Sequence, residues 1–319
     1  MDNMVMVLQV IVPLALLLWL VGRPSESRIG FLFQTIGTGL SLVASWFTAI
    51  WVMPPLWVFY IFAVLWLLGA GAGLYRMRTT TSPILPIRRA GWAGLAFSTL
   101  LTISGGYVSC IAYRGLTPQN TDVVEIRSPF PPGMYMVAHG GFNEMINGHA
   151  KIQNLPVERS KKWRGQTYGL DFFKIDELGL RVRGWRPTEP KAYVSYGTPI
   201  YAPCSGSVIS RTVDLPDMPV PVMDRDNMLG NHVLLDCGTY WVLLAHFRQG
   251  TVSVSPGDQI EVGTQLGELG NSGNSSEPHL HIHAQRPASS NHLISGEPLA
   301  MKIGGRFLVR NDILTIVAR

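Results

Sequence analysis

The chain has 319 residues, of which 47% are hydrophobic and 15% charged, and its formal net charge is +5. Its mean hydropathy of +0.19 is high for a wholly soluble protein, and its length allows two domains. The few charges form no long basic tract, so the composition argues against nucleic acid as a partner.

Four uncharged, apolar stretches occupy the first third of the chain. They are residues 4–22, 30–53, 56–74 and 90–113, with 19, 24, 19 and 24 residues. Because about 20 apolar residues in a helix cross the hydrocarbon core, we expect a four-helix transmembrane bundle over residues 1–113. The stretches contain no Asp, Glu, Lys, Arg or His, which is unusual for transporters. The bundle is therefore expected to be an anchor or a partner-binding surface.

The flanks of these stretches predict an orientation. Residues 1–3 carry no positive charge and no A-x-A pattern follows Gly22, so the first stretch is interpreted as an uncleaved anchor. Arginines occupy the loops after the first and third stretches, whereas residues 53–55, between the second and third, are uncharged. Since short arginine-rich loops stay in the cytoplasm, residues after Tyr113 are expected outside it. This predicts a multi-pass protein of the cell (inner or cytoplasmic) membrane with an extracytoplasmic soluble half, facing the periplasm or the wall.

The soluble half begins with a polar linker. We place this linker at residues 114–127 and a globular domain at 128–319, starting at the proline-rich residues 128–133, which suit neither a helix nor a central strand. Residues 230–236 and 240–247 read as a β-hairpin, with His246 at its end and His232 expected on the surface. Cys204 and Cys237 would either pair outside the cytoplasm or stay free and buried. The sequence contains no CxxC pair, so we do not expect a cysteine zinc site.

Three histidines alternate with apolar residues in PHLHIHAQ, residues 278–285. In a strand, His279, His281 and His283 would share one face, and Leu280 and Ile282 the other. Imidazole is the commonest nitrogen ligand of zinc and a general base near neutral pH. The glycine- and serine-rich residues 270–277 before it predict a turn-forming loop that delivers this strand.

The segment GELGNSGN (residues 267–274), followed by PHLH (278–281), resembles the signature of lysostaphin-type (LytM-like) zinc endopeptidases. These enzymes cut peptide bonds in bacterial cell-wall peptidoglycan. The resemblance covers the soluble half and does not reach the apolar first third. It implies a mainly-β peptidase domain with an antiparallel sheet, one Zn²⁺ as cofactor and a peptidoglycan peptide as substrate.

The resemblance also implies three zinc ligands. In one subgroup of the family, a ligand histidine is followed, after an insertion, by a Tyr-x-Leu-Asp-Phe-like strand whose aspartate is also a ligand. YGLDF at residues 168–172 matches that strand, which makes Asp171 and His149 ligands, and His281 is the third. The family's commonest motif places the first two four residues apart, whereas here they are 22 apart. His139 is therefore the competing first ligand.

By the same resemblance, His246 and His279 flank the metal as catalytic residues, one of them a general base, with the choice open. His283 is expected to support a ligand rather than touch substrate. The function expected is a membrane-anchored zinc metalloendopeptidase acting on peptidoglycan. Two alternatives are a non-catalytic LytM-like module that regulates another wall hydrolase and a membrane sensor that binds wall peptide. Partners in the membrane or among wall-synthesis proteins are compatible with both.

Overall fold

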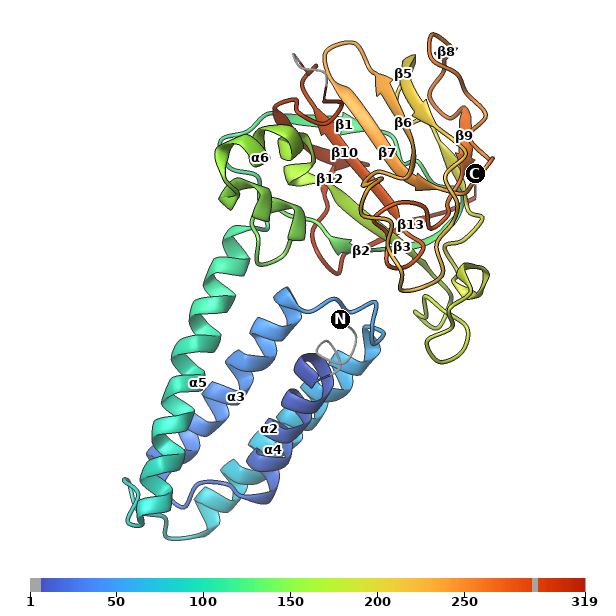
Figure 1. The fold of residues 1–319 in the computed structure, drawn as a ribbon. Helices are drawn as coiled ribbons and strands as arrows, with labels where there is room; N and C mark the ends of the chain where they lie inside the picture. The colour runs from blue at the N-terminus through green and yellow to red at the C-terminus, as the bar shows by residue number, and fades with distance from the viewer. Residues whose placement is uncertain (1–6, 289–291, 319) are drawn as a thin grey trace. The chain divides into compact units, whose positions relative to one another are not determined.

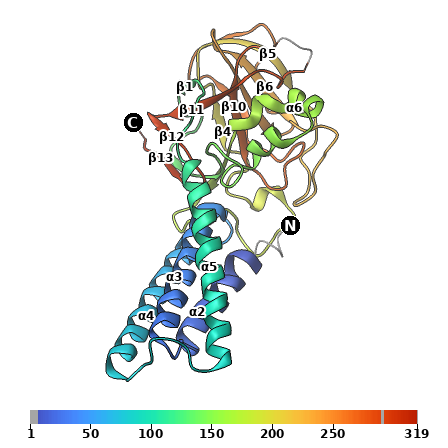
Figure 2. The same cartoon turned by 90° about the vertical axis from the view of Figure 1, so that its left-hand side faces the viewer.

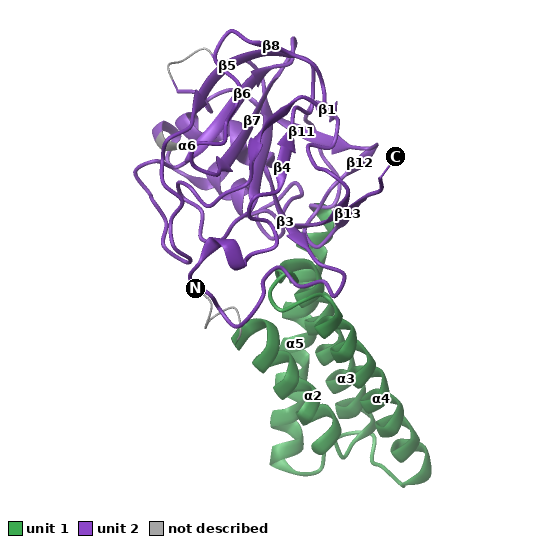
Figure 3. Cartoon of the chain, turned by 90° about the vertical axis from the view of Figure 1, so that its right-hand side faces the viewer, with its two compact units in different colours: residues 1–114 green, residues 115–319 purple. Residues whose placement is uncertain are grey.

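A computed structural model describes residues 7–288 and 292–318. The chain divides into two compact units, residues 1–114 and 115–319 (Figure 3). The first unit is helical and the second is built mainly from strands. Each unit is described by itself below.

The first unit consists of consecutive apolar helices (Figure 1). They are η1 (Val7–Ile11), α2 (Val12–Gly22), α3 (Arg28–Thr48), α4 (Trp57–Thr79) and α5 (Arg89–Arg114). By length and composition, α3, α4 and α5 could each cross a membrane, whereas the described part of the first expected span, Val7–Gly22, is shorter. Residues 4–6 of that span lie outside the described residues. The structure thus shows three of the four expected spanning helices.

Buried polar groups and small residues join these helices. The Gln34 side chain on α3 donates hydrogen bonds to the carbonyls of Trp19 and Arg23, which satisfies acceptors at the end of α2. On α4, a Cβ at Gly69 would lie 2.9 Å from Val21 Cγ2, and one at Gly73 would collide with the Phe31 ring. The glycine-rich segment of α4 therefore serves close helix packing.

The second unit is built on an eleven-stranded sheet. Its main path runs β13-β2-β3-β10-β7-β6-β5-β8, with β11 joining β10 to β1 and β12. All pairs are antiparallel except β1 with β11, which confirms the expected mainly antiparallel domain. The strands are β1 (Val123–Ile126), β2 (Gly133–His139), β3 (Leu170–Ile175), β5 (Gly206–Thr212), β6 (Asn231–Asp236), β7 (Trp241–Phe247), β8 (Gln259–Ile260), β10 (Leu280–Gln285), β11 (Pro298–Ile303), β12 (Arg306–Phe307) and β13 (Ile313–Ile316).

Shorter elements surround this sheet. β4 (Pro199–Tyr201) and β9 (Gln265–Glu268) form a separate antiparallel pair. The helical segments η2 (Gly148–Asn154), α6 (Val157–Trp163) and η3 (Arg164–Tyr168) fill the gap between β2 and β3, and η4 (Pro190–Ala192) precedes β4. Figure 2 shows α6 in front of the sheet. The span expected as a linker, residues 114–127, contains β1, which pairs with β11.

The histidine-bearing strand β10 has two different faces. Leu280, Ile282 and Ala284 are fully buried in the main hydrophobic core. His281 and His283 alternate with them on the opposite face, as the period of two predicts. On that face, Leu234, Leu243, Ala245 and Ile294 form a second, smaller apolar cluster against which Trp163 of the helical insert packs.

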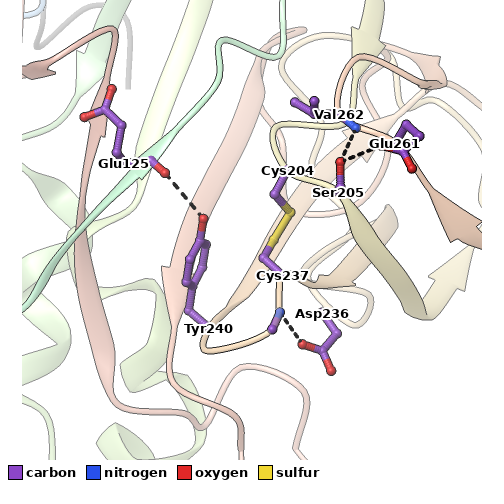
Figure 4. The surroundings of a disulfide bond; sticks show 9 residues. Glu125, Cys204, Ser205, Asp236, Cys237, Tyr240, Glu261 and Val262 are labelled. Atoms are coloured by element: carbon purple, nitrogen blue, oxygen red, sulfur yellow. Dashed lines mark hydrogen bonds between the residues drawn. A yellow bond between two sulfur atoms is a disulfide. The ribbon is translucent and has the colours of Figure 1, made fainter.

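A disulfide joins Cys204 to Cys237, two residues whose Cα atoms are 5.9 Å apart (Figure 4). It ties the start of β5 to the turn of the β6–β7 hairpin, and the sequence had left this pairing open. Hydrogen bonds surround it: the Ser205 hydroxyl contacts the Glu261 carboxylate at 3.0 Å and accepts the Val262 N–H at 2.9 Å. Cys204 and Cys237 both pack against the main core, so the disulfide anchors one edge of the sheet.

Candidate metal centre

The sheet register brings chemically reactive residues into one row. Asp171 on β3 lies opposite His139 on β2 and opposite His281 on β10, and His281 in turn lies opposite Ala245 on β7. Neighbouring strands are about 4.8 Å apart, so side chains at paired positions on one face touch. The structure therefore places the carboxylate of Asp171 beside the imidazole of His281.

His149 reaches the same row from outside the sheet. It is the second residue of η2, and the Asn147 side chain caps this helix by accepting the His149 N–H at 3.1 Å. The fully buried Asn147 also donates hydrogen bonds to the carbonyls of Gly141 and Gly169. Asn147 thereby ties the start of the insertion between β2 and β3 to its end. His149 therefore contacts Asp171 although the two residues are 22 apart in the sequence.

Three side chains converge on one point. The Asp171 Oδ2 atom is 3.0 Å from His149 Nε2, and its Oδ1 atom is 2.9 Å from His281 Nδ1. One potential ligand atom from each residue lies within 4.8 Å of the others. Asp171 and His281 are buried and His149 is partly exposed, so the cluster is accessible from one side. Two imidazole nitrogens and one carboxylate oxygen form a ligand set that suits zinc.

The charge of Asp171 fits this role. Burial alone would raise the pKa of its carboxyl, but His149, His279 and the hydrogen bonds from His149 and His281 hold it well below its usual range. Burial lowers the pKa of His281, which favours the neutral imidazole. An ionised carboxylate and neutral imidazoles are the forms that bind a metal ion.

His139, the competing first ligand, has other partners. Its Nδ1 atom accepts the Gly148 N–H at 3.1 Å and lies 3.0 Å from Arg310 Nη2. Burial, opposed by Asp171 and assisted by Arg310, lowers the pKa of His139 to about 3. The structure places His149 in the three-residue cluster and His139 beside it, with ring centroids 5.7 Å apart.

His246 faces the cluster because β7 bulges there. In the β6–β7 register, Ala245 pairs with His232 and Phe247 with Asn231, so His246 is the additional residue. Its φ of 69° lies in the left-handed region, a strained conformation for a residue other than glycine. A regular strand would turn its side chain away from Ala245 toward the main core. Instead its ring centroid lies 4.8 Å from that of His279 and 6.2 Å from that of His281.

His246 and His279 are anchored in the same way. The Nδ1 atom of His246 is 2.8 Å from the Ser272 carbonyl oxygen, and that of His279 is 2.8 Å from the Glu277 carbonyl oxygen. Because a carbonyl oxygen only accepts, Nδ1 is the donor in both rings, and Nε2 is the nitrogen left for other partners. The Nε2 atom of His279 points toward the cluster, 3.8 Å from Asp171 Oδ1.

His283 lies behind the cluster. It is fully buried, and its Nδ1 atom is 3.0 Å from the Nε2 atom of His281. Burial, with smaller contributions from His281 and His149, holds the pKa of His283 well below the usual range. It therefore contacts His281, and its expected role of supporting that ring stays a prediction.

Sequence reasoning missed several residues that shape the centre. Asn147 anchors His149, and Ser272 anchors His246. In the sequence, these two anchors are marked only by being small polar residues that each precede a glycine. His232, expected on the surface, is 7% exposed because it sits mid-sheet on β6 opposite Ala245, so that expectation is wrong. Gly169 lies against the cluster: a Cβ there would be 2.8 Å from His281 Cε1 and 3.4 Å from His149 Cδ2.

Gly169→Ala therefore tests the packing of the centre. Gly169 has φ of −60° and ψ of 152°, which alanine adopts freely, so the methyl group should act by displacing its close neighbours, the His281 and His149 rings and the Gln166 carbonyl oxygen at 3.0 Å. We expect zinc per purified chain to fall while the unfolding transition is retained. Gly71→Ala, with open space around the added methyl group, should keep the metal content of the parent. Equal zinc in both variants would contradict this placement of the ligands.

Part of the second unit matches a known protein family. Residues 191–292 match Peptidase family M23, a span that includes His246, His279 and His281 and begins after His149 and Asp171. Among curated proteins, none matches the chain.

Similar solved structures include a mutant catalytic domain of the prophage-encoded M23 protein EnpA from Enterococcus faecalis (21% identity, 38% of this chain, 68% of that chain, TM-score 0.26). Lysostaphin from Staphylococcus simulans (24% identity, 39% of each chain, TM-score 0.26) is another. A third is a putative M23 peptidase from Pseudomonas aeruginosa (21% identity, 57% of this chain, 54% of that chain, TM-score 0.28). The match thus spans less than two thirds of the length of the lysostaphin and Pseudomonas chains.

The chain carries a Peptidase family M23 domain of the LytM or lysostaphin type at residues 191–292.

Proposed function

We propose that the protein is a membrane-anchored zinc metalloendopeptidase that hydrolyses peptide bonds in bacterial cell-wall peptidoglycan. The observation that carries this proposal is the convergence of His149, Asp171 and His281, with His279 and His246 beside them. The family match of residues 191–292 supports the same reaction class.

In this proposal, His149 Nε2, one Asp171 carboxylate oxygen and His281 Nδ1 hold the zinc ion. Zinc in such a site lowers the pKa of water and polarises the scissile carbonyl. His283 contacts the Nε2 atom of His281 and so fixes its ring. The Nδ1 atom of His281 then remains directed at Asp171. The ionised Asp171 supplies a negative charge that favours a cation at this point.

His246 and His279 move the protons. Burial, together with His279 and His281, keeps the pKa of His246 well below its usual range, so its imidazole is neutral at neutral pH and Nε2 can accept a proton. Each ring can take a proton at Nε2 while its Nδ1–H stays bonded to a backbone carbonyl. Once protonated, Nε2 donates a hydrogen bond to the oxyanion that forms at the scissile carbon. The strained backbone of His246 fixes this group ahead of reaction.

Location at the cell envelope rests on separate observations. Three long apolar helices precede the peptidase domain. Arginines lie at residues 23–28 and 76–89, whereas residues 53–55 are uncharged. The Cys204–Cys237 disulfide is typical of oxidising compartments outside the cytoplasm. Both support an extracytoplasmic domain, which a wall substrate requires.

Removing single ligands tests the metal site. Asp171→Ala and His281→Ala should each lose the zinc, about one per chain in the parent, together with hydrolysis of purified wall. Treating the parent with a chelator should abolish hydrolysis, and adding zinc should restore it. His149→Ala should behave like the other two ligand variants, whereas His139→Ala should keep zinc. Metal measurement by elemental analysis decides, and the reverse result for the last two would exchange their roles.

Reporter fusions test the orientation. A reporter that works only outside the cytoplasm should be active when it is fused after the last residue. A reporter that works only in the cytoplasm should be active when it is inserted at residues 79–83, between α4 and α5. The physical reason is the retention of the arginine-rich loops in the cytoplasm. The opposite pattern would place the domain away from the wall and remove the proposed substrate.

A further inference from the structure

A second feature lies on the same face of the sheet as the metal centre. It is a cavity of about 550 Å³ outside the three-residue cluster. Its walls come from the end of α6, from β5 and β6, from residues 227–230 and from residues 292–294. Trp163, Leu229 and Leu293 give it apolar sides, and Lys162 contributes a cationic group.

His232 on β6 is one of the residues that line this cavity, and one of its ring nitrogens is unsatisfied. Its side chain is buried, with 7% exposure, and Nδ1 lies 2.9 Å from the Gly230 carbonyl oxygen. That oxygen only accepts, so Nδ1 carries the proton and Nε2 is a hydrogen-bond acceptor. Burial lowers the pKa of His232, which keeps the ring neutral. Within the described residues, Nε2 has no hydrogen-bond partner, an unfavourable state that a donor from a ligand would relieve.

The cavity adjoins the catalytic groups. His232 lies opposite Ala245, which lies opposite His281, so the three share one row over β6, β7 and β10. Two strand spacings separate His232 from His281 by about 10 Å. In addition, the carbonyl of Leu229 in the cavity wall accepts the His246 N–H at 3.2 Å. An extended peptide advances about 3.3–3.6 Å per residue, so the cavity lies about three residues from the scissile bond.

We propose that this cavity is a specificity subsite that binds the peptide portion of the wall substrate about three residues from the cleaved bond. In it, an N–H of the peptide donates to His232 Nε2, an apolar side chain packs on Trp163 and Leu293, and a carboxylate pairs with Lys162. A peptide supplies all three groups, namely a backbone N–H, apolar side chains and carboxylates. The assignment rests on the proposed function and adds the site of substrate selection.

Hydrolysis kinetics of the full-length protein in detergent test this subsite. The probe is a set of cross-linked muropeptides released from purified wall by a muramidase. His232→Leu removes the acceptor at similar size and should raise KM roughly five- to tenfold with kcat and zinc content unchanged. His232→Gln, which restores an acceptor oxygen, should recover most of the loss. Lys162→Glu should raise KM as well, whereas Lys161→Glu, on the same helix and outside the cavity, should not.

Measurements of muropeptide binding distinguish a failure of the subsite from a failure of the proposed function. Asp171→Ala should not hydrolyse the muropeptides, so calorimetry on this full-length variant measures their binding without turnover. The same measurement on Asp171→Ala combined with His232→Leu reports the contribution of the cavity. Weaker binding of the double variant supports the subsite even if the parent hydrolyses nothing, a result that would overturn only the proposed function. Unchanged KM and binding for His232→Leu, or equal losses with Lys161→Glu, would overturn the subsite while leaving the peptidase intact. Loss of binding to peptide-free glycan in His232→Leu would also overturn it.

Discussion

The chemistry of this domain depends on one buried carboxylate. Asp171 lies on an interior strand of the sheet, between His139 on β2 and His281 on β10, and His149 closes on it from the helical insertion. A carboxylate buried without compensation would take up a proton, but the imidazoles around Asp171 keep it ionised. The same negative charge that the imidazoles stabilise makes the point attractive to a metal cation. Without Asp171, the three candidate ligands would lose their only negative charge and keep two imidazole nitrogens.

The histidines divide their roles by the nitrogen that each presents. His246 and His279 bond a backbone carbonyl through Nδ1, which leaves Nε2 for the proposed proton transfer, whereas His281 directs Nδ1 at Asp171 and Nε2 at His283. His279 lies just before β10 and His281 within it, and the two rings thus present different nitrogens to the cluster. His232 has the same arrangement, because its Nδ1 bonds a backbone carbonyl and leaves Nε2 as an acceptor. In the proposed subsite, this third Nε2 would bind substrate and take no part in the reaction.

The sequence predicted the parts of this arrangement that depend on local periodicity. Alternation in residues 278–285 placed His281 and His283 on one face of a strand, the β6–β7 hairpin formed as expected, and the uncharged stretches predicted α3, α4 and α5. Long-range features were beyond it. The bulge that turns His246 toward the cluster arises from the pairing of β6 with β7, and the closure of the insertion depends on Asn147 meeting Gly169. The burial of His232 has the same cause, since only the sheet order shows that β6 is an interior strand.

The central claim is that neighbouring histidines separate into one that holds metal and one that moves protons. Its most direct test is to measure zinc content and wall hydrolysis in parallel for His279→Ala and His281→Ala, purified as full-length proteins. The account predicts that His279→Ala keeps the zinc of the parent and loses roughly 10²- to 10⁴-fold in turnover, because only a proton-transfer group is gone. His281→Ala should lose both. Loss of zinc from His279→Ala with retention in His281→Ala would exchange the two roles, and full hydrolysis by His279→Ala would contradict the account.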